Sequence, residues 1–258
     1  MKDIELFEKL QQESIDDIKR LYKLIEQKKG NLVGIVGLLH IDYMILGEIA
    51  ICYKKQYDIV KENFFKSSKM QEWFYRMYKN KMYDIDSSEV TTCSYETLYF
   101  AVLSGCKEQM VLMANYLGSF EEEEKEESCL TNTLLGYALK YVILDDVVNA
   151  MKYINQLEEN KSKRGMKQFA DGHARAFKGL IQREEKELNQ GLEFMLKHHV
   201  ARMKRDGKKL EQYFAYDSVA VAMLARERGI NITVKHELLP DEYLEKTDID
   251  YKSIEVII

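Results

Sequence analysis

The side chains that most often bind metals or transfer protons are few in this chain, and their spacing suits neither role. The five histidines are His40, His173, His198, His199 and His236. A metal site on a helix requires ligands three or four positions apart, and no two of these histidines have that spacing. The adjacent pair His198 and His199 would point about 100° apart on a helix, so they cannot easily share one ion. We therefore expect no metal site.

The carboxylates and the glycines offer no catalytic arrangement either. Asp16–Asp17 and Asp145–Asp146 are adjacent pairs, and neighbours on a helix face different directions, so neither pair forms an acid–base dyad. The segment 34–40, GIVGLLH, has two glycines but lacks the lysine–serine pair of a phosphate-binding loop. We expect no catalytic residue, no cofactor and therefore no enzyme.

One short segment, DGHAR at 171–175, places His173 and Arg175 on the same expected helix. One interpretation is a polar site that faces a groove. The pattern favours a simpler interpretation, in which Asp171 caps the start of a helix and His173 lies in its first turn.

Four cysteines, Cys52, Cys93, Cys106 and Cys129, lie far apart and contain no CxxC pair. Zinc sites and redox motifs need such closely spaced pairs. We therefore expect buried free thiols in the reducing cytoplasm.

The elements that must position these residues are helices, and three helix pairs follow one another along the chain. Each pair has an apolar helical run, a short polar turn and a second apolar helical run. The pairs are Thr97–Leu117, Leu134–Ile154 and Ala174–Met195, and the acids Glu108, Asp145 and Glu184 open their second helices at intervals of 37 to 39 residues. An acid at that position complements the positive end of the helix dipole. A repeat of this length is typical of stacked helical hairpins, which bury their apolar faces against their neighbours.

Further helices precede this repeat. Apolar positions at helical spacing predict a helix over 3–28, which Gly30–Asn31 ends. A second helix is predicted over about 36–62, and its first half is apolar nearly all round, so we expect it to be buried on most sides. A third helix, over about 68–80, carries the aromatic segment 73–75.

After the repeat, small and apolar residues predict a last helix over about 213–228, which Gly229 ends. The tail 230–258 has no helical period, so we expect an extended strap over the last helix or a short strand pair. These elements predict an all-α fold of stacked antiparallel helical hairpins, solenoid-like or an irregular bundle, with a short extended C-terminal tail. We expect an N-terminal helical region, 1–90, and a hairpin region, 91–258, that are continuous as one domain.

Composition and charge exclude nucleic acid as the expected partner. Hydrophobic residues make up 46% of the chain and charged residues 31%, which is ordinary for a globular protein. The net charge of −5 argues against a nucleic-acid-binding protein, which normally has a concentrated basic face. Basic residues do cluster at 161–167 and 197–209, and we interpret them as solvated helix ends.

The N-terminus and the longest apolar stretch indicate neither export nor a membrane. Acids occur from Asp3 onward, and no continuous apolar segment follows, so we expect no signal peptide. The apolar stretch 32–53 is interrupted by His40, Asp42 and Glu48, so we expect no membrane span. We expect a cytoplasmic protein.

Acidic segments and one aromatic segment are candidates for contact with a partner protein. The run 121–127 is acidic except for Lys125, and the tail is rich in acids. Such a run is most often a solvated loop, but acid-lined surfaces also speed the capture of basic proteins, such as nucleic-acid-cutting toxins. In the aromatic segment Phe74 fits a core, and Trp73 or Tyr78 could serve as an exposed anchor. The candidate partner-binding residues are Glu121, Glu122, Glu123, Glu124, Glu126, Glu127, Trp73, Tyr78, Asp241 and Glu242.

The C-terminal third resembles a known group of bacterial proteins. The segments that carry the resemblance are HARAFKGLIQREEKELNQGLEFMLKHHVARMKR (173–205), YFAYDSVAVAMLARERGINI (213–232) and LLPDEYL (238–244). Over residues 169–244 this order of helices and spacing resembles the immunity protein 49 family. The resemblance implies a protein that binds and blocks a secreted polymorphic toxin delivered between competing bacterial cells. It implies binding and carries over no catalytic residue.

Two hypotheses follow for the function. The first is an immunity protein that masks a cognate toxin by tight one-to-one binding. The alternative is a helical-repeat adaptor or regulator that binds a peptide or a signalling protein in a concave groove. Asparagines at equal positions of each hairpin would favour the adaptor, and Asn115, Asn149 and Asn189 lie at comparable places.

Overall fold

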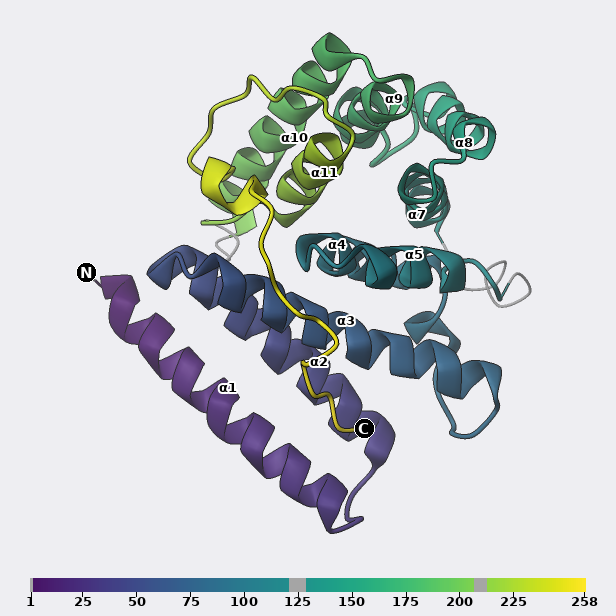
Figure 1. Ribbon diagram of the computed structural model, residues 1–258. Coiled ribbons are helices and arrows are strands. Elements are labelled where there is room, and N and C mark those ends of the chain that lie inside the picture. The colour runs from purple at the N-terminus through teal and green to yellow at the C-terminus, as the bar shows by residue number, and fades with distance from the viewer. Residues whose placement is uncertain (1, 121–128, 207–212) are drawn as a thin grey trace.

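The computed structural model describes residues 2–120, 129–206 and 213–258 (Figure 1). These residues contain no β-strand, only one isolated bridge between His236 and Leu239, so the expected all-α fold is confirmed. The α-helices are α1 (Lys2–Glu26), α2 (Leu32–Ile49), α3 (Tyr57–Lys79), α4 (Glu96–Leu103), α5 (Lys107–Tyr116), α7 (Leu130–Ile143), α8 (Val147–Glu159), α9 (Arg175–Gln182), α10 (Glu185–Asp206) and α11 (Tyr216–Glu227). In Figure 1, α1–α3 form a lower layer, α4 and α5 lie across α3, and α7–α11 form an upper layer.

The connection between the first two helices lies where the sequence signal Gly30–Asn31 places it. Gly30, at φ +83°, ends the connection after α1. Asn31 then caps α2, because its side-chain oxygen accepts a hydrogen bond from the backbone N–H of Val33 at 3.1 Å.

The single helix expected over about 36–62 is wrong. Helix α2 ends at Ile49 and continues as one π-helical turn, η1 (Ala50–Lys54), after which Lys55 adopts a left-handed φ of +50°. Helix α3 begins two residues later, so the expected third helix over 68–80 is its second half. The break carries neither glycine nor proline, and it lets α3 turn back and pack against α2.

The three expected hairpins are confirmed as α4–α5, α7–α8 and α9–α10. Each turn contains one residue in the left-handed region, namely Gly105 (φ +73°), Asp145 (φ +56°) and Arg183 (φ +56°). Asp145 therefore lies in the turn, and its neighbour Asp146 caps α8 by accepting a hydrogen bond from Asn149 N at 3.1 Å. Two of the three expected acids do sit where the helix dipole favours them, because Glu108 lies in the first turn of α5 and Glu184 immediately precedes α10.

The third hairpin is the tightest. A Cβ on Gly179 would lie 2.4 Å from the backbone N of Leu188, and a Cβ on Gly191 would lie 2.4 Å from the backbone N of Ala176. Glycine at both positions lets the backbones of α9 and α10 touch, which no larger residue permits.

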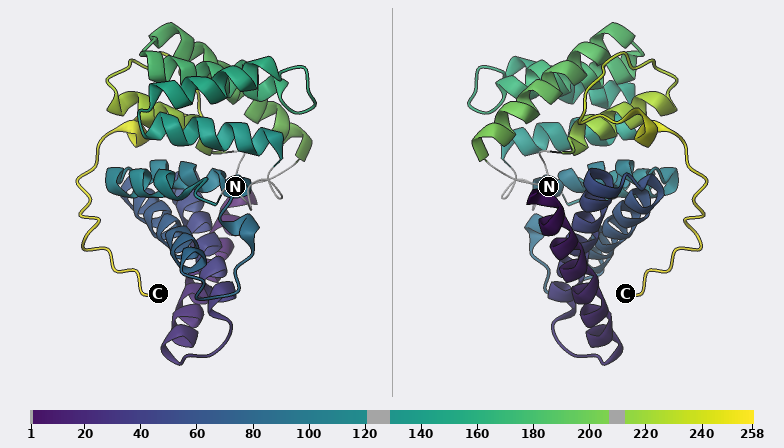
Figure 2. Two further views of the ribbon diagram at one scale, coloured as in Figure 1. Left: turned by 90° about the vertical axis from the view of Figure 1, so that its right-hand side faces the viewer. Right: turned by 90° about the vertical axis from the view of Figure 1, so that its left-hand side faces the viewer.

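The C-terminal tail, residues 230–258, runs in a mostly extended conformation from the upper layer down to the lower one, as expected (Figure 2). It contains only two short ordered features, the bridge at His236 and the 3₁₀-helix η5 (Asp241–Leu244). One cluster of buried hydrophobic residues extends from Leu21 in α1 to Leu244 in this tail. The tail is therefore part of the packed core and not an appendage.

Candidate functional site

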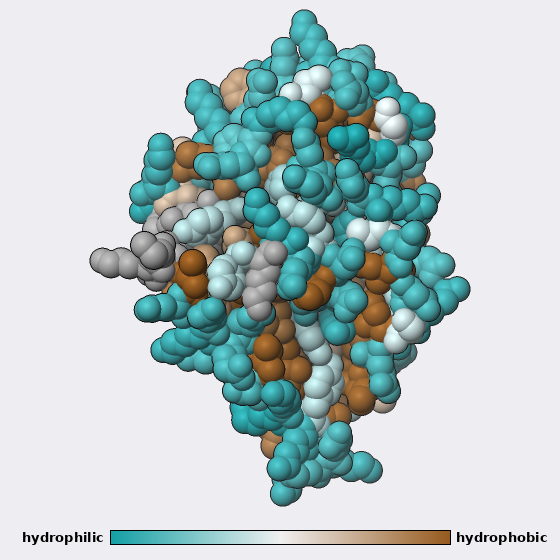
Figure 3. Space-filling view, turned by 60° about the vertical axis from the view of Figure 1, so that its left-hand side comes forward, coloured by the Kyte–Doolittle hydropathy of each residue, from teal (hydrophilic) through white to brown (hydrophobic). Residues whose placement is uncertain are grey.

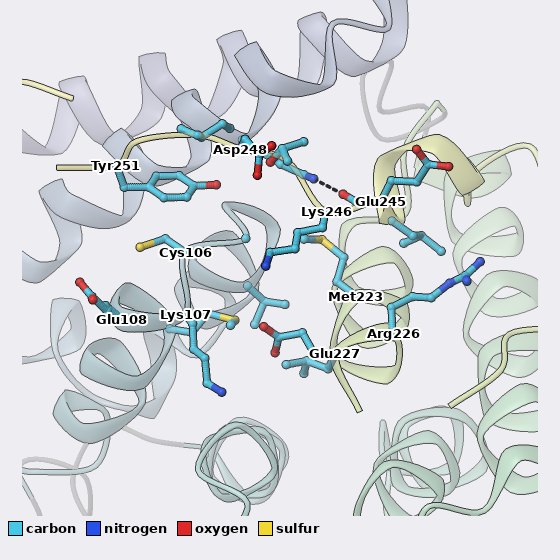
Figure 4. A pocket seen from close by; sticks show the side chains of 18 of the residues that line it. Cys106, Lys107, Glu108, Met223, Arg226, Glu227, Glu245, Lys246, Asp248 and Tyr251 are labelled. Atoms are coloured by element: carbon cyan, nitrogen blue, oxygen red, sulfur yellow. Dashed lines mark hydrogen bonds between the residues drawn. The ribbon is translucent and has the colours of Figure 1, made fainter. Parts of the chain in front are cut away.

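A groove of about 1130 Å³ lies where the C-terminal tail crosses between the two layers (Figure 4). One wall is the tail segment 241–252, which we call the strap. The opposite wall is the turn between α4 and α5 with the start of α5, and the C-terminal end of α11 closes the upper side. Ligand sites are typically concave and formed between elements, so this groove is the candidate functional site.

Side chains from distant parts of the chain hold the strap in place. Lys61 of α3 is buried, and its ammonium donates a hydrogen bond to the carbonyl of Glu245 at 2.7 Å. The Tyr243 hydroxyl donates to the carbonyl of Leu103 at 2.5 Å, and the Tyr251 hydroxyl donates to the carbonyl of Ser104. Both carbonyls belong to the C-terminal end of α4, where helix carbonyls lack partners within the helix.

The buried ammonium of Lys61 is electrostatically costly. Burial lowers its pKa, and the charges of Asp58 and Glu245 oppose that shift. Its ammonium also lies 5.3 Å from the centre of the Tyr243 ring, a favourable cation–π distance. These contacts offset the cost of burying the charge, so Lys61 can connect α3 to the strap.

Charges of both signs line the groove. The acids are Glu108, Glu227, Asp241, Glu245, Asp248 and Asp250, and the bases are Lys61, Lys107, Arg226, Lys246 and Lys252. In Figure 4 the side chains of Glu227 and Lys246 point into the space between the strap and α5, with Met223 beside Lys246. A groove of mixed charge suits a protein segment that carries both signs better than it suits a phosphate or a single ion.

The groove also contains a thiol, Cys106, in the turn before α5. Burial raises its pKa, so the thiol stays protonated near neutral pH and is a poor nucleophile. None of the four cysteines is in a disulfide, but the expectation that all are buried is wrong, because Cys129 is exposed and Cys52 and Cys93 are half-buried.

The structure separates the expected partner-binding residues. Asp241 lines the groove and pairs with Lys235, and Glu242 is exposed beside it in η5. Tyr78 is half-buried, with its ring edge-on to Phe120 at 5.0 Å. The residues Glu121, Glu122, Glu123, Glu124, Glu126 and Glu127 lie outside the described residues.

The prediction that Trp73 could serve as an exposed anchor is wrong. Its side chain is 3% exposed and packs against Phe74 and Tyr83 at ring distances of 5.4 and 5.3 Å. It lies on α3 three turns beyond Lys61, so it belongs to the core and does not approach the groove.

A buried polar cluster was not expected from the sequence. His173 Nε2 lies 3.2 Å from Asp217 Oδ2, and His199 is also buried nearby. Burial alone would raise the pKa of Asp217, but the hydrogen bond from His173 and the charges of both histidines lower it to about 2. The signal available in the sequence was Asp217 at the start of an otherwise apolar helix.

Both interpretations of His173 need correction. The helical backbone already runs through the π-helical turn η4 (Phe169–Ala174), so Asp171 does not cap a helix start. His173 is 7% exposed and does not line the groove. Its pairing with Asp217 joins the third hairpin to α11. Among the described residues no three metal-ligating side chains gather into a possible metal site.

Comparison with known proteins gives one match. The sequence model described as immunity protein 49 matches residues 96–243, from α4 to η5, which is more than half of the chain. The resemblance noted at 169–244 is confirmed, and the match extends upstream through all three hairpins. No curated protein and no solved structure matches. The chain belongs to the immunity protein 49 family.

Proposed function

We propose that this protein binds a cognate toxin one-to-one and neutralises it by covering the toxin's active site. The observation that carries the proposal is the family match over 96–243, because this range contains α4, α5 and α11, which form the groove walls other than the strap. We place the activity in the cytoplasm, where a toxin that cuts nucleic acid would meet its substrate.

The exposed carboxylates of the strap supply the electrostatic part of this proposal. Glu242, Glu245, Asp248 and Asp250 are exposed along one short segment. The active site of a nucleic-acid-cutting toxin is cationic, because it must bind phosphates. Acids on the strap would speed its capture and would compete with its substrate. The acidic run 121–127 is the second candidate contact.

The groove supplies the specific part. Its basic side chains, Lys107 and Lys246, would pair with acids of a toxin segment while Glu227 pairs with a base. A wrong toxin would leave some of these charges unpaired, which opposes its binding. Binding, and not catalysis, is therefore the activity that we assign to this site.

Co-expression with the product of any toxin gene that adjoins the gene for this protein tests the proposal. The wild-type protein is expected to restore growth and to co-purify with the toxin. The variant Asp248→Lys/Asp250→Lys, and separately a variant with lysine at Glu121–Glu124, should lose protection. The matched control for the Asp248/Asp250 variant is Glu5→Lys/Glu26→Lys on α1, which makes the same change in charge on exposed residues that do not line the groove.

Different outcomes separate the surface from the function. If both lysine variants protect as well as the control does, the proposed contact surface is wrong. If the wild-type protein neither protects nor co-purifies with the toxin, the proposed function is wrong. Circular dichroism of each variant verifies that the helices are intact.

The adaptor alternative gains no support from the asparagines. Asn115 is exposed and donates to its own helix at Val111 O, Asn149 bonds to the cap residue Asp146, and Asn189 is buried. The three side chains therefore do not line one groove.

A further inference from the structure

Helix α2 presents an apolar stripe to solvent. Gly34, Leu38, Ile41 and Ile45 lie three or four positions apart and so share one face of the helix. Leu38 is 48% exposed and Ile41 is 46% exposed. A helix that is apolar on all sides is normally covered on all sides, yet only 44% of the most apolar part of 32–53 is buried. On the face drawn in Figure 3, apolar side chains also reach the surface in the lower half of the molecule.

Gly34 has no explanation within a single chain. A Cβ at this position would meet no atom within 4 Å, so packing does not require glycine. Glycine makes a helix less stable than alanine does. No contact within the chain compensates for this loss of stability. A flat position in an apolar stripe does allow a bulky side chain of another molecule to come close.

A pair of opposite charges borders the stripe. Asp17 and Arg20 of α1 form an exposed ion pair at 2.9 Å. Both charges act on the carboxyl of Asp42, which places the pair beside α2 next to the stripe. Helices α1 and α2 are antiparallel and joined at 27–31, so the middle of this pair lies level with the middle of the stripe, between Leu38 and Ile41.

We propose that the stripe binds a second copy of this chain about a two-fold axis at this level, with the two α2 helices antiparallel. The axis sets Gly34 opposite Ile45 of the second copy, so the isoleucine side chain fills the space that glycine leaves open. It also sets Leu38 opposite Ile41 of the second copy, so these two apolar side chains contact each other. It also sets Asp17 opposite Arg20 of the second copy, so both ion pairs join into one network.

The rim distinguishes this occupant from a membrane surface. A helix that lies on an anionic membrane needs a cationic border, whereas the border here includes the acids Asp17 and Asp42 beside Arg20, and the chain carries a net charge of −5. A stable interface needs roughly 1,200–2,000 Å² in total, so α1 must contribute to it along with α2. None of the stripe residues lines the groove, so the pairing is separate from the toxin contact proposed above.

Sedimentation velocity of the purified full chain, over about 1 to 100 µM, measures the association. The wild-type protein is expected to pass from monomer to dimer in this range. Leu38→Glu places a charge in the apolar contact, and it should raise the dimer dissociation constant at least about tenfold. The matched control Val148→Glu changes a residue of α8 that is 79% exposed, and it should dimerise as the wild type does.

Two further variants keep the test independent of folding. Gly34→Leu should raise the thermal midpoint of the monomer, because leucine favours helix, and yet weaken the dimer by blocking Ile45 of the second copy. Asp17→Arg alone and Arg20→Asp alone should each weaken the dimer, and the double exchange should restore it. A wild-type protein that stays monomeric at the highest concentration overturns the proposal. A Leu38→Glu variant that dimerises as the wild type does also overturns it. The same holds if Leu38→Glu leaves the dimer intact and weakens only the binding of anionic lipid vesicles or of the toxin.

Discussion

The side-chain oxygen of Asn189 accepts a hydrogen bond from the backbone N–H of Thr233 at 2.7 Å and another from Val234 at 3.3 Å. Its amide nitrogen donates to the carbonyls of Glu185 at 2.8 Å and of Asn231 at 3.0 Å. One buried side chain on α10 therefore satisfies three backbone groups of the tail where it leaves α11.

Replacing Asn189 with alanine should destabilise the protein by about 2–4 kcal/mol, because it leaves several buried backbone groups without partners. Urea unfolding followed by circular dichroism measures this change. Asn115→Ala is the control, since that side chain is exposed and bonds only to its own helix. Its effect should stay within about 0.5 kcal/mol. Equal effects of the two substitutions would show that the tail does not depend on this clamp.

The Asp217–His173 pair predicts a loss of stability in acid. The pKa of Asp217 is lowered from 3.8 to about 2, so the folded state binds the proton less tightly than the unfolded state does. The stabilisation is complete above about pH 4 and disappears as the pH falls through 2, and it amounts to about 2 kcal/mol. Asp217→Asn should flatten the free energy of unfolding between pH 4 and 2. A wild-type protein whose stability does not change over this window would contradict the pairing.

The close contact of α9 and α10 predicts opposite effects for two Gly→Ala changes. Gly179→Ala should destabilise by about 1–3 kcal/mol, because the added carbon would overlap the backbone of Leu188. Gly34→Ala should stabilise the monomer by about 0.5–1 kcal/mol, because its surroundings are open. Thermal unfolding at low protein concentration compares the two. A stabilising Gly179→Ala would mean that the helices lie further apart than the structure has them.

The strap predicts protection from trypsin. Lys246 and Lys252 are exposed cleavage sites within it, but the backbone around them is held by Lys61 and Tyr251. Tyr251→Phe removes the hydrogen bond to Ser104 and should raise the rate of cleavage in the strap several-fold, because local opening needs about 1 kcal/mol less. Mass spectrometry of timed digests locates the cuts. Tyr83→Phe, on a 40% exposed tyrosine, is the control and should leave the rate unchanged.

The hairpins could be predicted because their signals are local. Apolar residues at helical spacing identify α7 and α8, and Gly229 identifies the end of α11. The break between α2 and α3 could not be predicted, because Lys55 adopts a left-handed conformation and neither it nor its neighbours are residue types that favour one. Trp73 was ambiguous for a similar reason, since burial of one helix face depends on what packs against it.

The sequence by itself determined a helical chain, its hairpin order and its family, since these follow from local periodicity and from a pattern of residues in line. Only the tertiary structure decided which distant groups meet. Arg228 donates to the carbonyl of Val142 at 2.6 Å, Tyr243 to that of Leu103, and Lys140 to that of Leu117 at 2.6 Å. Each donor satisfies a carbonyl near the end of a helix far away in the sequence, where the last carbonyls need a partner from outside. The packing of the helices determines which donor reaches each carbonyl. Such a pairing cannot be predicted from the sequence, because the two residues have no fixed spacing along the chain.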